Sequence, residues 1–237
     1  MPQHAPFTSC PRPEPGRPPP VIAGRLRSLP WGERGTAGAA IPAELALEEV
    51  VHAYGEARAL DGVTLTVEAG EVVCLLGRSG CGKTTLLRVA AGIEQPASGR
   101  VLLDGRVVSG PGHFLPPERR GIGLMFQDYA LFPHLTLLEN VAFGLRALSR
   151  REAEGAARRA LARVGLEAQA LDYPHGLSGG EQQRVALARS IAPRPGILLM
   201  DEPFSNLDRR MRDAIREETL AVLRETGATT LVVTHDP

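Results

Sequence analysis

The chain reads Gly77-Arg78-Ser79-Gly80-Cys81-Gly82-Lys83-Thr84 directly after a short apolar run, and this segment decides the fold. The spacing Gly-x4-Gly-Lys-Thr is typical of a loop whose backbone N–H groups cradle phosphates while the lysine reaches the β- and γ-phosphates. Lys83 is the only lysine of the chain, since 26 of the 27 Lys and Arg residues are arginine. The planar guanidinium of arginine does not replace a compact ammonium at such a site. We therefore interpret Lys83 as a phosphate-binding residue rather than a lysine that fell there by chance.

The sequence on either side supplies the strand and the helix that a true phosphate-binding loop requires. Residues 72–76 are a continuous apolar run, which predicts a strand buried on both faces of a parallel sheet. Residues 84–91 continue with a helical period. This order predicts an α/β fold of the P-loop NTPase (RecA-like) kind, with a core sheet flanked by helices.

Further elements follow from periodicity, working outward from the loop. Residues 45–54 and 63–67 alternate, and they predict an antiparallel β part at the N-terminal end of the domain. More strands are expected at 100–103, 121–126, 196–200 and 228–234, and a helix at 209–226. Residues 128–189 contain helical periods at 137–148 and 150–164 and no strand candidate. We expect a helical subdomain there, inserted into the sheet domain.

Composition bounds the class of protein. The 237 residues carry no net charge, which gives the chain no electrostatic reason to bind nucleic acid. No apolar run approaches the roughly 20 residues that span a bilayer, so membrane association is expected to go through a partner. The three cysteines form neither a disulfide framework nor a metal-ligand spacing. Residues 1–42 hold ten of the 20 prolines, which predicts a disordered Pro/Arg-rich extension ahead of a domain at 43–237.

Two other segments carry chemistry. The apolar run 197–200 ends in Asp201 and Glu202. Alone, this would be a solvated acidic turn, but behind a phosphate-binding loop the first carboxylate can hold Mg²⁺ and the second can position an attacking water. Leu177-Ser178-Gly179-Gly180-Glu181-Gln182-Gln183-Arg184 places a serine and two glycines before a helical run, where N–H groups at the positive helix end can face an anion. A plain helix cap would use the same residues.

This last segment resembles the signature sequence of the ATP-binding cassette (ABC) ATPases, the nucleotide-binding subunits of ABC transporters, without a mismatch. The resemblance covers about residues 45–237. It implies that the signature of one subunit completes the phosphate site of a second copy, with two ATP molecules between subunits arranged head to tail. Two anion-binding segments in one chain agree with that arrangement, because a phosphate needs only one such nest.

The resemblance also assigns roles to individual residues. It implies that Tyr54 stacks on adenine, although a core tyrosine of a strand is the alternative, and that Asp208 lies in a loop that crosses between subunits. Cys81 is a tolerated loop residue, or a thiol open to oxidative control. The implied catalytic residues are Glu202, His235 and Gln127, and the implied Mg²⁺ site comprises Thr84, Gln127 and Asp201. The implied ATP contacts are Tyr54, Gly77, Ser79, Gly80, Cys81, Gly82, Lys83, Thr84, Thr85, Ser178, Gly179, Gly180 and Asp208.

The expected function is therefore that of an ATP-hydrolysing subunit that powers import of a solute through transmembrane permease subunits. It would lie peripherally on the cytoplasmic face of the inner membrane and serve a periplasmic binding protein indirectly. A non-transport ABC ATPase is the alternative, as is an inactive fragment, since family members continue beyond residue 237 and the resemblance implies a C-terminally truncated chain.

The segment Phe126-Gln127-Asp128-Tyr129-Ala130-Leu131-Phe132-Pro133-His134-Leu135 is similar to the importer branch of the family. The segment 115–120, Leu-Pro-Pro-Glu-Arg-Arg, resembles ferric-iron importers more than polyamine, sulfate or sugar importers. Leu131, Phe132 and Leu135 suit an apolar surface that receives a helix of the permease, or they pack inside the helical subdomain.

Overall fold

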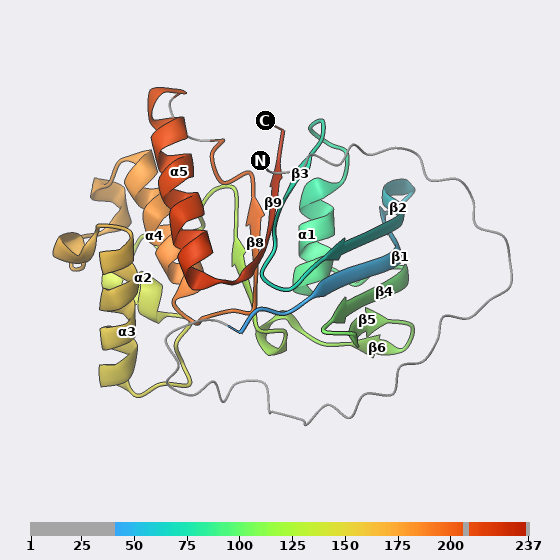
Figure 1. Cartoon of the computed structure of the whole chain (residues 1–237), viewed down its shortest axis with the longest axis horizontal. Helices are drawn as coiled ribbons and strands as arrows, with labels where there is room; N and C mark the ends of the chain where they lie inside the picture. The colour runs from blue at the N-terminus through green and yellow to red at the C-terminus, as the bar shows by residue number, and fades with distance from the viewer. Residues whose placement is uncertain (1–40, 206–208, 236–237) are drawn as a thin grey trace, which may run out of the picture. The chain divides into compact units, whose positions relative to one another are not determined.

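The computed structural model describes residues 41–205 and 209–235, and two β-sheets carry the fold within these ranges (Figure 1). One sheet is antiparallel with the strand order β2-β1-β4-β5-β6, and the other is parallel with the order β3-β9-β8-β7. The strands are β1 Leu45–Tyr54, β2 Ala57–Val67, β3 Val72–Leu76, β4 Ser98–Leu103, β5 Arg106–Gly110, β6 His113–Phe114, β7 Ile122–Met125, β8 Ile197–Asp201 and β9 Thr229–Thr234. Residues 1–40 of the predicted extension and Asp208 lie outside the described ranges.

Helices cover both faces of the parallel sheet (Figure 1). Helix α1 packs on the face that is turned toward the antiparallel sheet, while α4 and α5 pack on the opposite face. The α-helices of the described residues are α1 Lys83–Ala91, α2 Leu137–Ala142, α3 Arg150–Arg163, α4 Gly179–Ile191 and α5 Arg209–Thr226. Short 3-10 turns occupy Pro117–Arg119, Glu167–Gln169 and Pro174–Gly176. None of the helices in this part of the chain combines the length and apolar character needed to cross a membrane.

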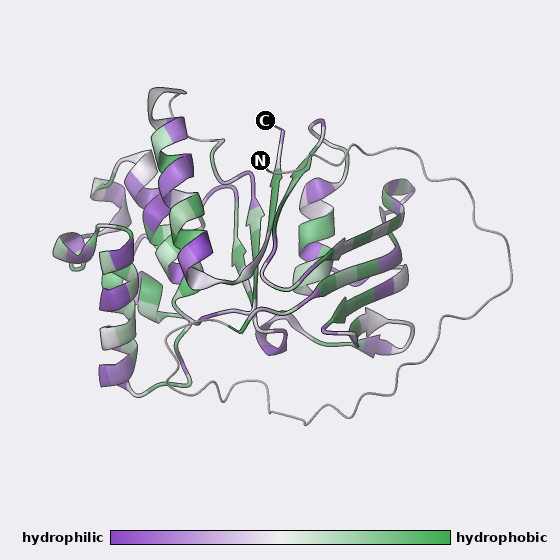
Figure 2. Ribbon diagram, in the orientation of Figure 1, coloured by the Kyte–Doolittle hydropathy of each residue, from purple (hydrophilic) through white to green (hydrophobic). Residues whose placement is uncertain are grey.

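Alternation along the central strands divides the core in two. In β8, Ile197 and Leu199 belong to the cluster shared with α1 and the antiparallel sheet. Leu198 and Met200 belong to the cluster shared with α2–α5. Both sets are almost fully buried, and Figure 2 shows the parallel strands as hydrophobic along their length. Because alternate side chains of a strand point to opposite faces, the same sheet packs against the helices of 128–189 on one face and against helix α1 on the other.

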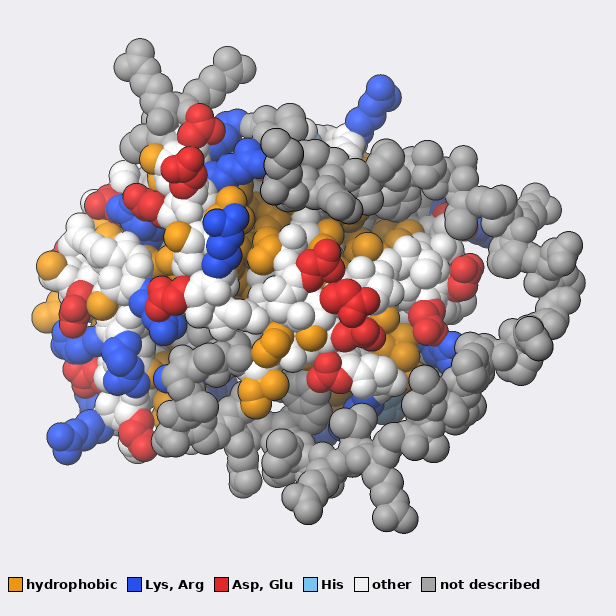
Figure 3. Space-filling view, viewed as in Figure 1, with side chains coloured by type: hydrophobic (Ala, Val, Ile, Leu, Met, Phe, Trp, Pro, Cys, Tyr) orange, Lys and Arg blue, Asp and Glu red, His pale blue; other side chains and the backbone are white. Residues whose placement is uncertain are grey.

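The apolar run 72–76 does form a strand, but its predicted burial on both faces is wrong. β3 lies at the end of the strand order, paired with β9. Val73 and Leu75 pack against the core on the α1 side, whereas Val72 and Leu76 are 37% and 38% exposed. Figure 3 shows hydrophobic side chains at the surface in the middle of this face. A continuous apolar run does not distinguish a central strand from an edge strand.

Most predicted elements appear with shifted ends. Strand 45–54 and helix 209–226 match the structure, and β2 begins six residues before the predicted 63–67. The helix predicted at 137–148 is too long, because α2 ends at Ala142 before the poor helix former Gly144, and Ser149 caps the next helix. The short strands β5 and β6 were not predicted, since Gly and Pro interrupt every period between 105 and 117.

Candidate active site

The phosphate-binding loop connects β3 to α1, and its geometry leaves the start of that helix open to an anion. Helices α2, α3 and α4 each begin with a capping box, in which a Ser or Thr and a Glu satisfy the first N–H groups. Helix α1 has Gly82 at that position, with no side-chain cap and no acidic residue in its first turn. Gly82 has φ 95°, and a Cβ there would overlap the carbonyl oxygen of Ala59. Only glycine fits, and the positive helix end faces outward.

Lys83 folds over the loop that precedes it. Its Nζ donates to the carbonyl oxygens of Gly77 at 2.6 Å and Arg78 at 2.9 Å, and lies 3.8 Å from the Sγ of Cys81. The side chain is 7% exposed, so the ammonium charge lies at a desolvated position beside the loop. Electrostatic attraction of a phosphate is stronger there than in open water.

Thr84 and Asp201 meet at the inner end of the loop. The Oγ1 of Thr84 donates to the Oδ1 of Asp201 at 3.0 Å, across 117 positions of sequence. Burial raises the pKa of the Asp201 carboxyl, and the hydrogen bond from Thr84 acts in the opposite direction. A hydroxyl and a carboxylate form a hard oxygen donor pair of the kind that Mg²⁺ accepts.

Glu202 and His235 are hydrogen-bonded at the ends of β8 and β9. The Oε2 of Glu202 accepts from the ring Nδ1 of His235 at 2.8 Å and from its backbone N–H at 3.3 Å. Because an ionised carboxylate only accepts, Nδ1 carries the proton in this contact. Glu202 is 9% exposed and has φ 45°, a backbone conformation that a residue with a Cβ adopts only when its surroundings impose it.

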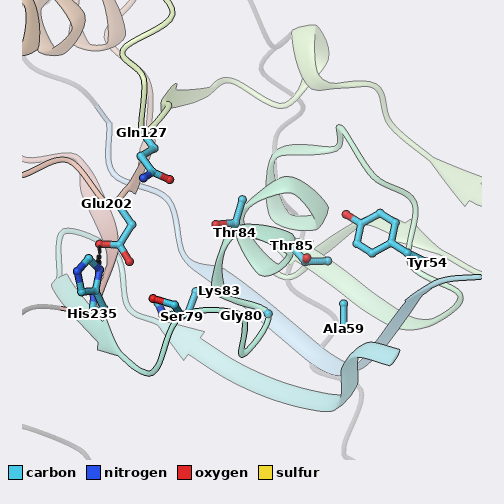
Figure 4. A pocket seen from close by; sticks show the side chains of 11 residues that line it. Tyr54, Ala59, Ser79, Gly80, Lys83, Thr84, Thr85, Gln127, Glu202 and His235 are labelled. Carbon is cyan, nitrogen blue, oxygen red and sulfur yellow. Dashed lines mark hydrogen bonds and ion pairs between the residues drawn. The ribbon is translucent and has the colours of Figure 1, made fainter. Parts of the chain in front are cut away.

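These groups line one pocket of about 520 Å³ (Figure 4). Gln127, Glu202 and His235 lie on one side of it, the phosphate-binding loop lies below, and Tyr54 closes the other side. The Tyr54 ring is 46% exposed and packs edge-on against His52 with the centroids 4.8 Å apart. The lining residues are Tyr54, Ala59, Ser79, Gly80, Gly82, Lys83, Thr84, Thr85, Gln127, Glu202 and His235.

Other predicted site residues do not line this pocket. Gly77 and Cys81 contact Lys83 from within the loop, and Asp201 reaches the site through Thr84. Ser178 lies at the start of α4, where its N–H and Oγ both donate to the Oε2 of Glu181, at 2.8 and 2.7 Å. Gly179 and Gly180 form the first turn of the same helix.

Ala59 lines the pocket although the sequence did not predict it. It belongs to the first half of β2, which the alternation from residue 63 onward did not include. Its main signal is the turn at Gly55 and Glu56, which joins β1 and β2 as a hairpin and brings Ala59 toward the loop. In the described part of the chain, no group of three or more His, Cys, Asp or Glu residues could hold a metal by itself.

Comparison with known proteins gives consistent matches. A family model described as ABC transporter matches residues 60–205. The sulfate/thiosulfate import ATP-binding protein of Chromobacterium violaceum is 48% identical over 81% of this chain and 52% of its own length. The Fe(3+) ions import ATP-binding protein of Brucella melitensis is 47% identical over 82% of this chain and 55% of its own. The chain thus spans about half the length of the curated relatives it matches.

Solved structures agree with the fold. A bacterial ABC transporter cassette, solved as a dimer, superposes with a TM-score of 0.70 at 36% identity, over 81% of this chain and 88% of that one. The cbiO1 subunit of Clostridium perfringens gives a TM-score of 0.71 at 32% identity, over 81% and 78% of the two chains. The P-loop NTPase fold predicted from the sequence is therefore confirmed.

Proposed function

The chain belongs to the ABC transporter family, and from that premise we propose that it is the ATP-hydrolysing subunit of an importer. The observation that carries the proposal is that Lys83, Gln127, Glu202 and His235, from separate parts of the sequence, line the same pocket. Hydrolysis adds the oxygen of a water to the γ-phosphorus and breaks the bond to ADP. Lys83 binds the phosphate oxygens, Glu202 orients the water and receives its proton, and His235 holds Glu202 and contacts the γ-phosphate.

Tyr54 supplies a face for the adenine ring at the far side of the same pocket. Its exposed ring stands opposite Glu202 and His235 (Figure 4), which leaves the loop of Lys83 between base and reaction centre. Stacking on an aromatic ring is tolerant of the base, so Tyr54 contributes affinity rather than discrimination.

Mg²⁺ fits the donor set of this site. Thr84 and Asp201 present a hydroxyl and a carboxylate to each other at 3.0 Å. Mg²⁺ is generally held by one or two carboxylates together with substrate phosphates, which agrees with so few protein ligands. We assign Thr84 and Asp201 as its ligands, with Gln127 nearby, and its chemistry is to neutralise charge on the phosphates.

A second copy of this chain supplies the other half of the site. Ser178, Gly179 and Gly180 match the signature segment and lie at the start of α4, where the Ser178–Glu181 capping box satisfies the first N–H groups, and they do not line the pocket of their own chain. A head-to-tail dimer brings this segment over the phosphates bound by the partner copy. The dimeric cassette among the similar structures supports that assembly.

A membrane permease is the proposed partner, and the surface beside Gln127 supports it. Phe132 and Phe143 lie with ring centroids 4.4 Å apart, and Phe143 is 43% exposed. Leu131 and Leu135 are half-buried, which agrees both with packing inside the helical subdomain and with a surface that receives a permease helix. A helix of the permease would rest on this apolar surface, which makes the ATPase a peripheral protein on the cytoplasmic face of the inner membrane.

The identity of the transported solute is the most specific part of the proposal. The names of three relatives refer to the import of sulfate or thiosulfate, the transport of putrescine (a protein of Escherichia coli) and the import of ferric ions, and these relatives are 47 to 48% identical to this chain. We propose ferric iron because of the segment 115–120, delivered by a periplasmic binding protein. Transport of radioactive iron in cells that carry or lack the gene tests this, and uptake of sulfate or putrescine instead would contradict it.

Lys83→Arg tests the phosphate site directly. We expect ATP to bind about tenfold more weakly. The guanidinium does not fit where the ammonium donates to Gly77 and Arg78, with only 7% of the lysine exposed. Equilibrium titration with a fluorescent ATP analogue measures the affinity.

The reverse exchange, Arg to Lys, at an exposed position provides the control. Arg106 is exposed on β5, and Arg106→Lys should leave the affinity unchanged. Equal affinity of wild type and Lys83→Arg would contradict the role of Lys83. Co-purification with a permease separates an importer from a non-transport ATPase of the same family.

A further inference from the structure

Two residues just after Gln127 adopt an unfavourable backbone conformation. Tyr129 has φ 61° and Ala130 has φ 45°, and neither is glycine. A Cβ makes this left-handed region costly, so consecutive residues remain there only when the surroundings impose it. The turn is closed by the Tyr129 N–H, which donates to the carbonyl oxygen of Phe126 at 3.0 Å, and the Tyr129 side chain is buried in the core.

One side chain holds both strained residues from outside the turn. The two terminal nitrogens of Arg189 donate to the carbonyl oxygens of Ala130 and Tyr129, each at 2.6 Å. The same guanidinium lies over the ring of Phe132, 5.5 Å from its centroid. A planar fork with fixed N–H directions suits two neighbouring carbonyls, and a single ammonium cannot reproduce it. Arg189 therefore holds the turn through three contacts, at Tyr129, Ala130 and Phe132.

Arg189 also belongs to the helix that carries the signature segment. It lies in the last turn of α4, and Ser178 caps the first turn of that helix. A helix of 13 residues forms a rod about 20 Å long. The contacts of Arg189 thus join the far end of this rod to the turn that follows Gln127.

We propose that Arg189 is a positioning residue that holds Gln127 at the pocket through the Tyr129–Ala130 turn and ties this turn to the helix that begins at Ser178. The inference rests on the proposed function, because the family resemblance gives Gln127 a catalytic role and Gln127 lines the proposed ATP pocket. Arg189 itself lines no part of the pocket. Its effect on hydrolysis must therefore pass through Gln127.

The test compares Arg189→Met, Arg189→Lys and the control Arg163→Met in the full chain. Arg163 lies on α3 and pairs with Glu225 of α5 at 3.4 Å, so its removal disturbs the same helical layer without touching the turn. Arg189→Met should lower kcat about tenfold and leave the dissociation constant for ATP within about twofold, because the phosphate-binding loop is intact. Arg189→Lys should recover part of the lost rate, since one carbonyl keeps its donor.

A double-mutant cycle with Gln127→Ala separates positioning from general damage. If Arg189 acts through Gln127, then Arg189→Met lowers kcat by less than about twofold once Gln127 is already alanine. Equal losses in both backgrounds would overturn the inference. Weaker ATP binding in parallel with the lost rate would overturn it as well, because that pattern indicates a structural role.

Amide hydrogen exchange keeps the inference testable if hydrolysis is absent. Arg189→Met should speed exchange in a peptide that covers 127–132 and leave β8 protected, and Arg163→Met should do neither. Unchanged exchange in 127–132 would show that Arg189 does not hold the turn. If the wild-type chain shows no ATPase activity but Arg189→Met still speeds exchange in 127–132, the proposed function would be contradicted. The proposed contact between Arg189 and the Tyr129–Ala130 turn would still stand.

Discussion

Glu202→Gln should lower the steady-state rate of ATP hydrolysis by about 10²- to 10⁴-fold, the contribution typical of a side chain that takes up the proton of the attacking water. The amide keeps the shape of the carboxylate. Its oxygen can still accept from the Nδ1 of His235, which lies 2.8 Å from Oε2 of Glu202 in the unmodified chain. It cannot take up a proton. ATP should therefore bind normally, and the ATP-bound dimer should accumulate because hydrolysis no longer opens it.

Rate and assembly must be measured together to test this result. Phosphate release gives the rate, and light scattering coupled to size exclusion gives the mass with and without ATP. Glu154→Gln is the control, since Glu154 pairs with Arg158 at 3.3 Å on the exposed side of α3. Undiminished turnover of Glu202→Gln would remove Glu202 from the reaction, and a rate lost together with ATP affinity would indicate a damaged pocket.

Local patterns explain which residues at the centre of the pocket could be predicted from the sequence. Gly82 is required by its φ and by the nearby Ala59 carbonyl, and such constraints leave a fixed spacing in the sequence. Asp201 and Glu202 end an apolar strand, so their position at the edge of a parallel sheet follows from the run before them. The Glu202–His235 contact was not predictable, because it depends on the pairing of β8 with β9.

Burial was harder to predict than the elements themselves. The runs 72–76 and 197–200 are equally apolar, yet β8 is buried throughout while Val72 and Leu76 of β3 are exposed. The difference is the place of each strand in the sheet order, which long-range pairing decides. Composition along one strand carries no information about its neighbours.

The side-chain contacts of Arg189 and Arg120 could not be predicted from the sequence either. Both are single members of a large set of arginines, and neither stands in a motif that specifies a carbonyl partner. The partners of Arg189 lie 59 and 60 positions away, and those of Arg120 on α1 lie 30 and 31 positions away. Only the folded arrangement reveals that Arg189 binds a turn and that Arg120 binds the end of a helix.

Arg120→Met should destabilise the fold by about 2–3 kcal/mol, because it removes hydrogen bonds from a charged donor and leaves buried carbonyl oxygens without a partner. Arg120 is 1% exposed, and its guanidinium donates to the carbonyl oxygens of Val89 and Ala90 in the last turn of α1 at 3.1 and 2.9 Å. It also donates to Leu115 at 2.8 Å and to Ser109 of β5. Burial lowers the pKa of Arg120 to about 10, so the group remains charged and donates at neutral pH.

Its neighbour provides a matched control. Arg119 is exposed, and Arg119→Met should change the free energy of unfolding by less than about 0.5 kcal/mol. The midpoints of urea unfolding for both variants measure the difference, and equal midpoints would contradict the prediction. Arg120→Lys should fall between them, because lysine keeps the charge but cannot reach α1, Leu115 and β5 together. Helix α1 carries the phosphate-binding loop at its start, so a loosened end should also weaken ATP binding in the fraction that remains folded.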